Sequence, residues 1–168
     1  GQMNAEITVI GGGLAGSEAA YYLAKRGRKV RLVDIKPKSF SPAHKSGNYG
    51  ELVCSNSLKS NDVYGNACGT LKEEMRILGS MIIACADATR VPAGAALAVD
   101  RDAFSALITE KLRKTGNIEF VCEEITDVDL DGNVIIATGP LTTPRLCEFI
   151  KKITGDGFYF YDAAAPIV

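Results

Sequence analysis

The stretch Ile7-Thr-Val-Ile-Gly-Gly-Gly-Leu-Ala-Gly16 decides the fold, because a short β-branched run is followed at once by a glycine-rich turn. Residues 7–10 predict a buried strand. Gly11, Gly13 and Gly16 have the GxGxxG spacing of a strand that turns into a helix. Gly11 allows the tight turn, Gly13 lets a pyrophosphate approach the backbone, and Gly16 lets the helix pack closely on the strand. The stretch is the opening of a nucleotide-binding βαβ unit, whose helix N-terminus attracts negative charge.

The residues after the turn complete the unit. A helix is expected to end near Gly27, and residues 30–33 predict a second strand that ends at Asp34. Asp34 lies where the acidic ribose ligand belongs, and its carboxylate would repel the 2′-phosphate of NADP. Because Lys36 and Lys38 follow closely, NADP is not fully excluded as a ligand. The side chains expected to be buried on the helix are Ala19, Ala20, Leu23 and Ala24. The cofactor contacts predicted here are Gly11, Gly12, Gly13, Leu14, Ala15, Gly16 and Asp34.

Composition is that of a globular chain. The 168 residues suffice for one domain or the larger part of one, and 46% hydrophobic with 23% charged residues excludes disorder. The net charge of −1 offers no attraction to a polyanion across the whole sequence. No apolar run is long enough to span a bilayer and no signal peptide is evident, so we expect a cytoplasmic protein without a membrane partner. Five cysteines without a CxxC pair indicate a reduced chain without a zinc site or other metal site.

Beyond Asp34 the regular pattern lapses as far as Gly69, and long loops in compact domains are usually functional. A capping box at Thr70 and Glu73 then predicts a helix. Its expected buried face is formed by Leu71, Met75, Leu78 and Ile82.

The second half of the chain alternates strands and helices. Residues 96–99 predict a strand, Asp100 a helix cap and Gly116 the end of that helix. Its expected buried stripe is Phe104, Leu107, Ile108 and Leu112. Further strands are predicted at residues 118–121, 124–128 and 134–137, the last as a strand buried on both faces of a parallel sheet. Thr143 and Pro144 predict the start of a last helix.

The strand at 134–137 leads into the tripeptide Ala137-Thr138-Gly139. In flavoproteins that bind two dinucleotides, a strand ending in this way passes beside the cofactor, so Thr138 and Gly139 are predicted cofactor contacts and FAD is favoured over NAD. We therefore expect an α/β protein with an FAD/NAD(P)-binding, Rossmann-like, three-layer fold. Residues 158–168 end without a cap, so residues 3–168 are expected to be the N-terminal part of the FAD domain of a longer, two-domain flavoprotein.

Six runs carry a resemblance to a known family. They are residues 11–20, 51–60 (Glu-Leu-Val-Cys-Ser-Asn-Ser-Leu-Lys-Ser), 71–76, 91–94, 96–101 and 162–168. Together they resemble the folate- and FAD-dependent tRNA (uracil-5-)-methyltransferases, and residues 51–60 are the most specific part. The resemblance implies an FAD enzyme that takes a methylene group from methylenetetrahydrofolate. It also implies NAD(P)H as the reductant and 5-methyluridine in the T-loop of tRNA as the product.

Cys54 is the candidate catalytic residue. It lies in the long loop after the Asp34 strand, and a loop leaving the carboxyl edge of the sheet runs toward the cofactor. Methylation at carbon 5 of uracil needs a nucleophile at carbon 6 and a base for the carbon 5 proton, and a thiolate serves for either. A helix N-terminus at residues 55–58 would lower its pKa. By resemblance Cys54 matches a family active-site cysteine; which cysteine attacks uracil stays open, as does a buried, unreactive Cys54 beside Leu52 and Val53.

Three alternatives stay open at this point. A flavin-dependent disulfide reductase would need a redox cysteine pair at CxxC or CxxxxC spacing, which the sequence lacks. The tRNA wobble-uridine modification flavoproteins share the glycine motif but lack a match to residues 51–60. A non-enzymatic nucleotide-binding module would be colourless, whereas a flavin site would make the protein yellow.

Overall fold

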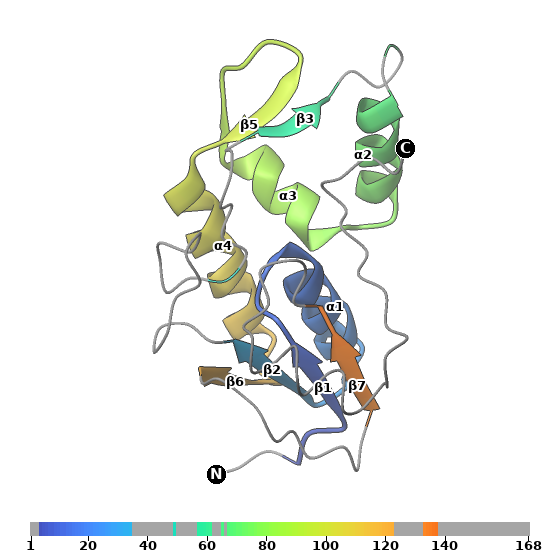
Figure 1. Cartoon of the computed structure of the whole chain (residues 1–168), viewed down its shortest axis with the longest axis vertical. Helices are drawn as coiled ribbons and strands as arrows, with labels where there is room; N and C mark the ends of the chain where they lie inside the picture. The colour runs from blue at the N-terminus through green and yellow to red at the C-terminus, as the bar shows by residue number, and fades with distance from the viewer. Residues whose placement is uncertain are drawn as a thin grey trace, which may run out of the picture.

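Four parallel strands form the main sheet, in the order β6-β2-β1-β7 (Figure 1). Their bounds are β1 (Ile7–Ile10), β2 (Val30–Asp34), β6 (Ile118–Cys122) and β7 (Asn133–Ile136). The predicted strands at 7–10, 30–33 and 118–121 are thereby confirmed, and β1 lies between β2 and β7. The computed structural model describes residues 4–34, 49, 57–61, 65, 67–122 and 133–137.

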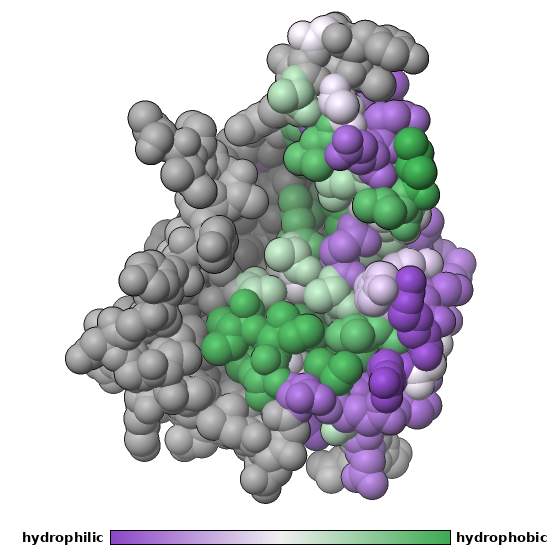
Figure 2. All heavy atoms as spheres, turned by 90° about the vertical axis from the view of Figure 1, so that its right-hand side faces the viewer, coloured by the Kyte–Doolittle hydropathy of each residue, from purple (hydrophilic) through white to green (hydrophobic). Residues whose placement is uncertain are grey.

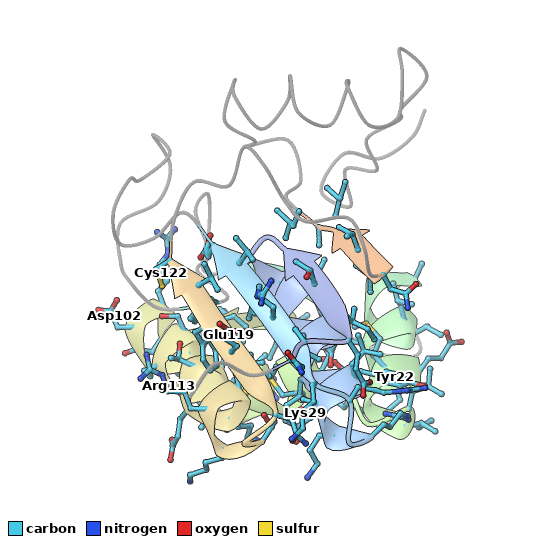
Figure 3. All side chains as sticks on the ribbon, turned by 90° about the horizontal axis from the view of Figure 1, so that it is seen from below. Tyr22, Lys29, Asp102, Arg113, Glu119 and Cys122 are labelled. Atoms are coloured by element: carbon cyan, nitrogen blue, oxygen red, sulfur yellow. The ribbon has the colours of Figure 1, made fainter. Side chains whose placement is uncertain are left out.

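Helices α1 (Leu14–Lys25) and α4 (Arg101–Lys114) lie on one face of this sheet (Figures 1 and 3). Their apolar side chains form the core together with the inward side chains of the strands, and the burial of this much apolar area is the main stabilising term. The parallel α/β fold is confirmed, with the sheet and one helical layer present among the described residues. The fully buried large side chains include Val9, Val30, Leu32, Phe104, Ile108 and Leu112.

The two ends of α4 follow the prediction. The Asp100 side chain accepts a hydrogen bond from the Ala103 N–H at 2.9 Å, which satisfies one of the free donors of the first turn. Gly116 has a φ of 71°, a conformation that favours glycine and lets the chain leave the helix. The predicted stripe is confirmed, with Leu107 only partly buried.

A second, antiparallel sheet has the order β3-β5-β4. Its strands are β3 (Ser57–Ser60), β4 (Arg90–Val91) and β5 (Ala96–Val99), so the strand predicted at 96–99 is confirmed. The helix start predicted at residues 55–58 is wrong, because Ser57 and Ser60 pair with Ala98 and Ala96 across the ladder. Pairing with β5 supplies backbone hydrogen bonds that override the local preference for a helix cap.

The helix predicted from the capping box is in fact two helices, α2 (Ala67–Ile77) and α3 (Met81–Ala88). Helix α2 begins before Thr70, and Gly79, with a φ of 80°, separates it from α3. This break turns the expected apolar face, so Ile82 is buried whereas Leu71 and Leu78 are 56% and 85% exposed. The prediction of one continuous buried face is therefore wrong.

Strand β7 belongs to the parallel sheet, as predicted, and pairs with β1, but it is not buried on both faces. Ile135 and Ile136 are 38% and 39% exposed, because β7 has a strand partner on one side only among the described residues. Figure 2 shows the apolar side chains that are exposed on the side of the molecule that carries β7 and α2.

Several predictions fall outside the described residues, namely the strand at 124–128, the helix from Thr143, and residues 158–168. Within the described ranges, none of the helices combines the length and apolar character that crossing a membrane requires.

Candidate functional site

Two hydrogen bonds and one close backbone approach hold the glycine turn between β1 and α1. Gly11 has a φ of 114°, and its N–H donates to the Val33 carbonyl at 2.8 Å. The buried Ser17 hydroxyl donates to the Gly12 carbonyl at 3.2 Å. A Cβ on Gly16 would lie 1.8 Å from the Gly11 carbonyl oxygen, so only a hydrogen atom fits there. The roles predicted for Gly11 and Gly16 in shaping the turn are therefore confirmed.

Gly13 faces open space at the N-terminus of α1. Among the described residues, no heavy atom beyond its chain neighbours lies within 4 Å of the position that a Cβ would take there. Gly13 is the N-cap of α1 but has no side chain to accept a hydrogen bond, whereas Ser80 and Asp100 cap α3 and α4 with their side chains. The first N–H groups of α1, from Leu14 onward, therefore suit the pyrophosphate of a dinucleotide.

Asp34 ends β2 beside the same turn. Its side chain is largely buried, and its Oδ2 atom lies 2.5 Å from the position that a Cβ on Gly12 would take. The predicted closeness of the acid to the glycine turn is thus confirmed. A carboxylate so placed can accept hydrogen bonds from the adenosine ribose of a nucleotide whose pyrophosphate lies at α1.

Ala137 extends β7 toward the turn. Its N–H donates to the Ile10 carbonyl at 2.8 Å, and its Cβ lies 3.6 Å from the position of a Cβ on Gly16. The start of the predicted Ala-Thr-Gly element therefore meets the glycine turn. Thr138 and Gly139 themselves, and the candidate catalytic Cys54, are outside the described residues, so their roles stay predictions.

The two described cysteines whose side chains are placed have different surroundings. Cys85 is fully buried in α3, and burial raises the pKa of its thiol to about 11, so it is a poor nucleophile at neutral pH. Cys122 is half-buried at the end of β6 (Figure 3), where its sulfur lies 3.6 Å from the Tyr49 hydroxyl. The described part of the chain holds no cluster of three or more metal-ligating side chains.

Sequence reasoning missed three residues around the turn. Ser17 is a hydroxyl residue directly after the glycine motif, which is the one local signal among the three. Glu18 reaches across to α3, where its carboxylate accepts hydrogen bonds from the Ser80 hydroxyl and the N–H groups of Met81 and Ile82. Tyr49 reaches the turn from the long segment after β2, and no pattern in the sequence marks it.

A strand, a glycine turn, a helix with an open N-terminus and a terminal acid on the next strand define a class of protein. The chain has the Rossmann-like fold of dinucleotide-binding domains. It belongs to the family described as glucose inhibited division protein A, whose family model matches residues 6–168.

Two curated relatives have the same name. The chain is 58% identical over 163 residues to the methylenetetrahydrofolate--tRNA-(uracil-5-)-methyltransferase TrmFO of Lactobacillus johnsonii, which is 96% of this chain and 37% of that protein. It is 58% identical over 167 residues to the protein of the same name from Fusobacterium nucleatum, covering 99% of this chain and 38% of that one. The chain thus spans less than two fifths of the length of these relatives.

One solved structure that the chain resembles is that of the GidA-related protein from Thermus thermophilus. It aligns with 82% of this chain and 54% of its own chain, at 16% identity and a TM-score of 0.44.

Proposed function

We propose that this chain is the N-terminal, FAD-binding part of a flavoenzyme that methylates tRNA. The enzyme would transfer a methylene group from methylenetetrahydrofolate to carbon 5 of the T-loop uridine, with NAD(P)H as reductant, and so form 5-methyluridine. The single observation that carries this proposal is the 58% identity over 96% of the chain to a relative named as such a methyltransferase. The nucleotide-binding geometry of the glycine turn supports it independently.

The described residues suit FAD in two places. The open space at Gly13 admits the pyrophosphate to the N-terminus of α1, and the Asp34 carboxylate accepts the ribose hydroxyls. Thr138 and Gly139 follow Ala137, which lies at the turn, and are proposed to contact the cofactor. A flavin bound there and reduced by NAD(P)H would supply the hydride that converts the transferred methylene group to a methyl group. The proposal includes both NADH and NADPH as possible reductants.

Cys54 is proposed to act on the uracil ring. As a thiolate it would either add to carbon 6, which activates carbon 5, or take the proton from carbon 5 after the methylene group has been delivered. Because residues 57–60 form β3, the helix dipole first expected to lower the thiol pKa is not the source of that activation. A nearby cation or the bound substrate would have to lower it instead.

The proposed partners are tRNA and the folate co-substrate, and a tRNA substrate agrees with the expected cytoplasmic location. The net charge of −1 provides no general attraction to tRNA, so a basic tRNA-binding surface is proposed to lie in the additional length that the relatives possess.

The test uses the protein expressed from its complete gene. It should purify yellow with a flavin absorption band, and should form 5-methyluridine in a T-loop transcript when methylenetetrahydrofolate and NAD(P)H are added. Cys54→Ala should keep FAD and tRNA binding and lose most of the turnover, because the change removes chemistry rather than packing. Cys85→Ala is the matched control, since Cys85 is buried and its thiol stays protonated. Near-normal 5-methyluridine formation by Cys54→Ala would refute the role of Cys54, and a colourless protein would favour a nucleotide-binding module.

A further inference from the structure

Tyr49 is held by three contacts with residues of α4 and β6. Its backbone N–H donates to the Thr109 hydroxyl at 3.0 Å, in a buried position. Its own hydroxyl lies 3.6 Å from the Cys122 sulfur. Its ring packs on Phe120, with 5.2 Å between the ring centroids and a tilt of 54°. Contacts of both backbone and side chain leave this tyrosine little freedom of position.

The same ring reaches the glycine turn. The Tyr49 Cδ1 atom lies 2.6 Å from the position that a Cβ on Gly12 would take, and the Asp34 Oδ2 atom lies 2.5 Å from that same position. The ring and the carboxylate therefore both lie close to the same point beside Gly12. This explains the glycine at position 12, which the GxGxxG spacing does not require, because any side chain there would displace one group or the other.

The surroundings of Tyr49 keep its hydroxyl neutral. Burial is the main reason why the pKa of Tyr49 lies above its ordinary value, and the neighbouring Cys122 and Asp34 raise it further. A neutral ring can pack against the Asp34 carboxylate without adding a second negative charge. Both residues are buried beside the turn, since Tyr49 is 3% and Asp34 9% exposed, so little water reaches either side chain.

We propose that Tyr49 is a positioning residue, which holds the Asp34 carboxylate at the glycine turn in the orientation that accepts the ribose hydroxyls of FAD. This inference rests on the proposed FAD-binding function. An aspartate side chain has two rotatable bonds, and a rigid aromatic wall beside it removes orientations that do not face the ribose. A shielded carboxylate also makes a stronger charge-assisted hydrogen bond than one in water.

The test compares FAD with its 2′-deoxyadenosine analogue, which lacks one ribose hydroxyl. Apoprotein prepared from the protein as encoded is titrated with each ligand, and the ratio of the two dissociation constants is the readout. Wild type should prefer FAD by about tenfold, the effect of one hydrogen bond to a charged acceptor. In Tyr49→Ala that ratio should fall below about threefold, because the carboxylate is no longer directed. Tyr49→Phe keeps the ring and should keep most of the preference.

Two further variants complete the design. Tyr22→Ala is the matched control, because Tyr22 is 54% exposed on α1 and contacts Arg26 rather than the turn (Figure 3). It should leave the ratio unchanged. Tyr49→Leu retains an apolar side chain in the buried position, so it replaces Tyr49→Ala if the latter does not fold, with the same expected loss of preference.

The outcomes separate this inference from the proposed function. If wild type does not bind FAD, the proposed function fails. If wild type prefers FAD and Tyr49→Ala or Tyr49→Leu retains the full ratio, even with weaker binding of both ligands, then Tyr49 is merely structural and the inference is overturned while the function stands.

Discussion

Asp34 is the side chain whose loss should most directly weaken nucleotide binding. We predict that Asp34→Ala lowers the affinity for FAD by about tenfold or more, because ribose hydrogen bonds to a charged acceptor are lost, each worth about 1.5–3 kcal/mol at most. Flavin retention during purification and equilibrium titration measure the effect. Unchanged retention, or an adenosine ribose bound elsewhere in a cofactor complex, would overturn the assignment.

Gly13 and Gly16 provide a matched pair of single-methyl changes. Gly16→Ala should lower the free energy of unfolding by about 1–3 kcal/mol or more, because the new Cβ would meet the Gly11 carbonyl. Gly13→Ala should lower the free energy of unfolding by less than about 1 kcal/mol, since its Cβ enters open space. It should nevertheless weaken FAD binding by about tenfold, because the new methyl group occupies the space through which the pyrophosphate approaches the helix.

Urea denaturation of the two variants and FAD titration are the measurements. If both changes affected stability and FAD binding to the same degree, the separation between a packing glycine and a ligand-facing glycine would be wrong.

Among single side chains, those of the glycine motif and Asp34 could be predicted because their roles follow from spacing along adjacent elements. Tyr49 could not, because its importance comes from contacts with Thr109, Cys122 and the turn, which are distant in sequence. Hydrophobic periodicity carries no information about such contacts.

Glu18 links the nucleotide-binding helix to the rest of the chain. From the first half of α1 it accepts hydrogen bonds from Met81 N–H at 2.9 Å and Ile82 N–H at 3.2 Å, both at the N-terminus of α3. The carboxylate therefore satisfies donors that the helix itself leaves free, and it interacts favourably with the positive end of the helix dipole.

We predict that Glu18→Gln lowers the free energy of unfolding by about 1–3 kcal/mol, because the charge and one acceptor oxygen are lost at a half-buried helix end. Glu6→Gln is the control, since the ion pair of Glu6 with Arg28 is exposed and a change within about 0.5 kcal/mol is expected. Chemical denaturation distinguishes them, and equal effects of the two changes would contradict a capping role.

Elements with strong local signals were predictable and those set by tertiary pairing were not. Helix α4 has an Asp cap, an apolar stripe and a terminal glycine, and all three are confirmed. The region of α2 and α3 reads as one amphipathic helix because its apolar residues recur across the break, and Gly79 by itself did not reveal the turn. Strand β3 depends on β5, which follows it in the chain by more than 30 residues.

For the molecule as a whole, the 168 residues alone should bind FAD weakly or be found without it. The adenosine contacts at the glycine turn lie within this chain, whereas the relatives are more than twice as long, and we expect their further segments to enclose the flavin ring. Titration of the purified chain with FAD, beside a full-length relative such as the Lactobacillus johnsonii protein, tests this. Tight stoichiometric binding by the short chain would show the prediction to be wrong.

The place of β1 between β2 and β7 has a consequence for biosynthesis. Ile7 pairs with Val30 on one side and with Asn133 on the other, so one edge of the central strand waits for a partner made much later. At synthesis rates of about 5–20 residues per second, the interval between Ile10 and Ile136 is roughly 6–25 s. During that time the open edge of β1 can pair with other nascent chains. Slow translation or chaperone binding in this interval should therefore determine how much of the protein reaches its native sheet.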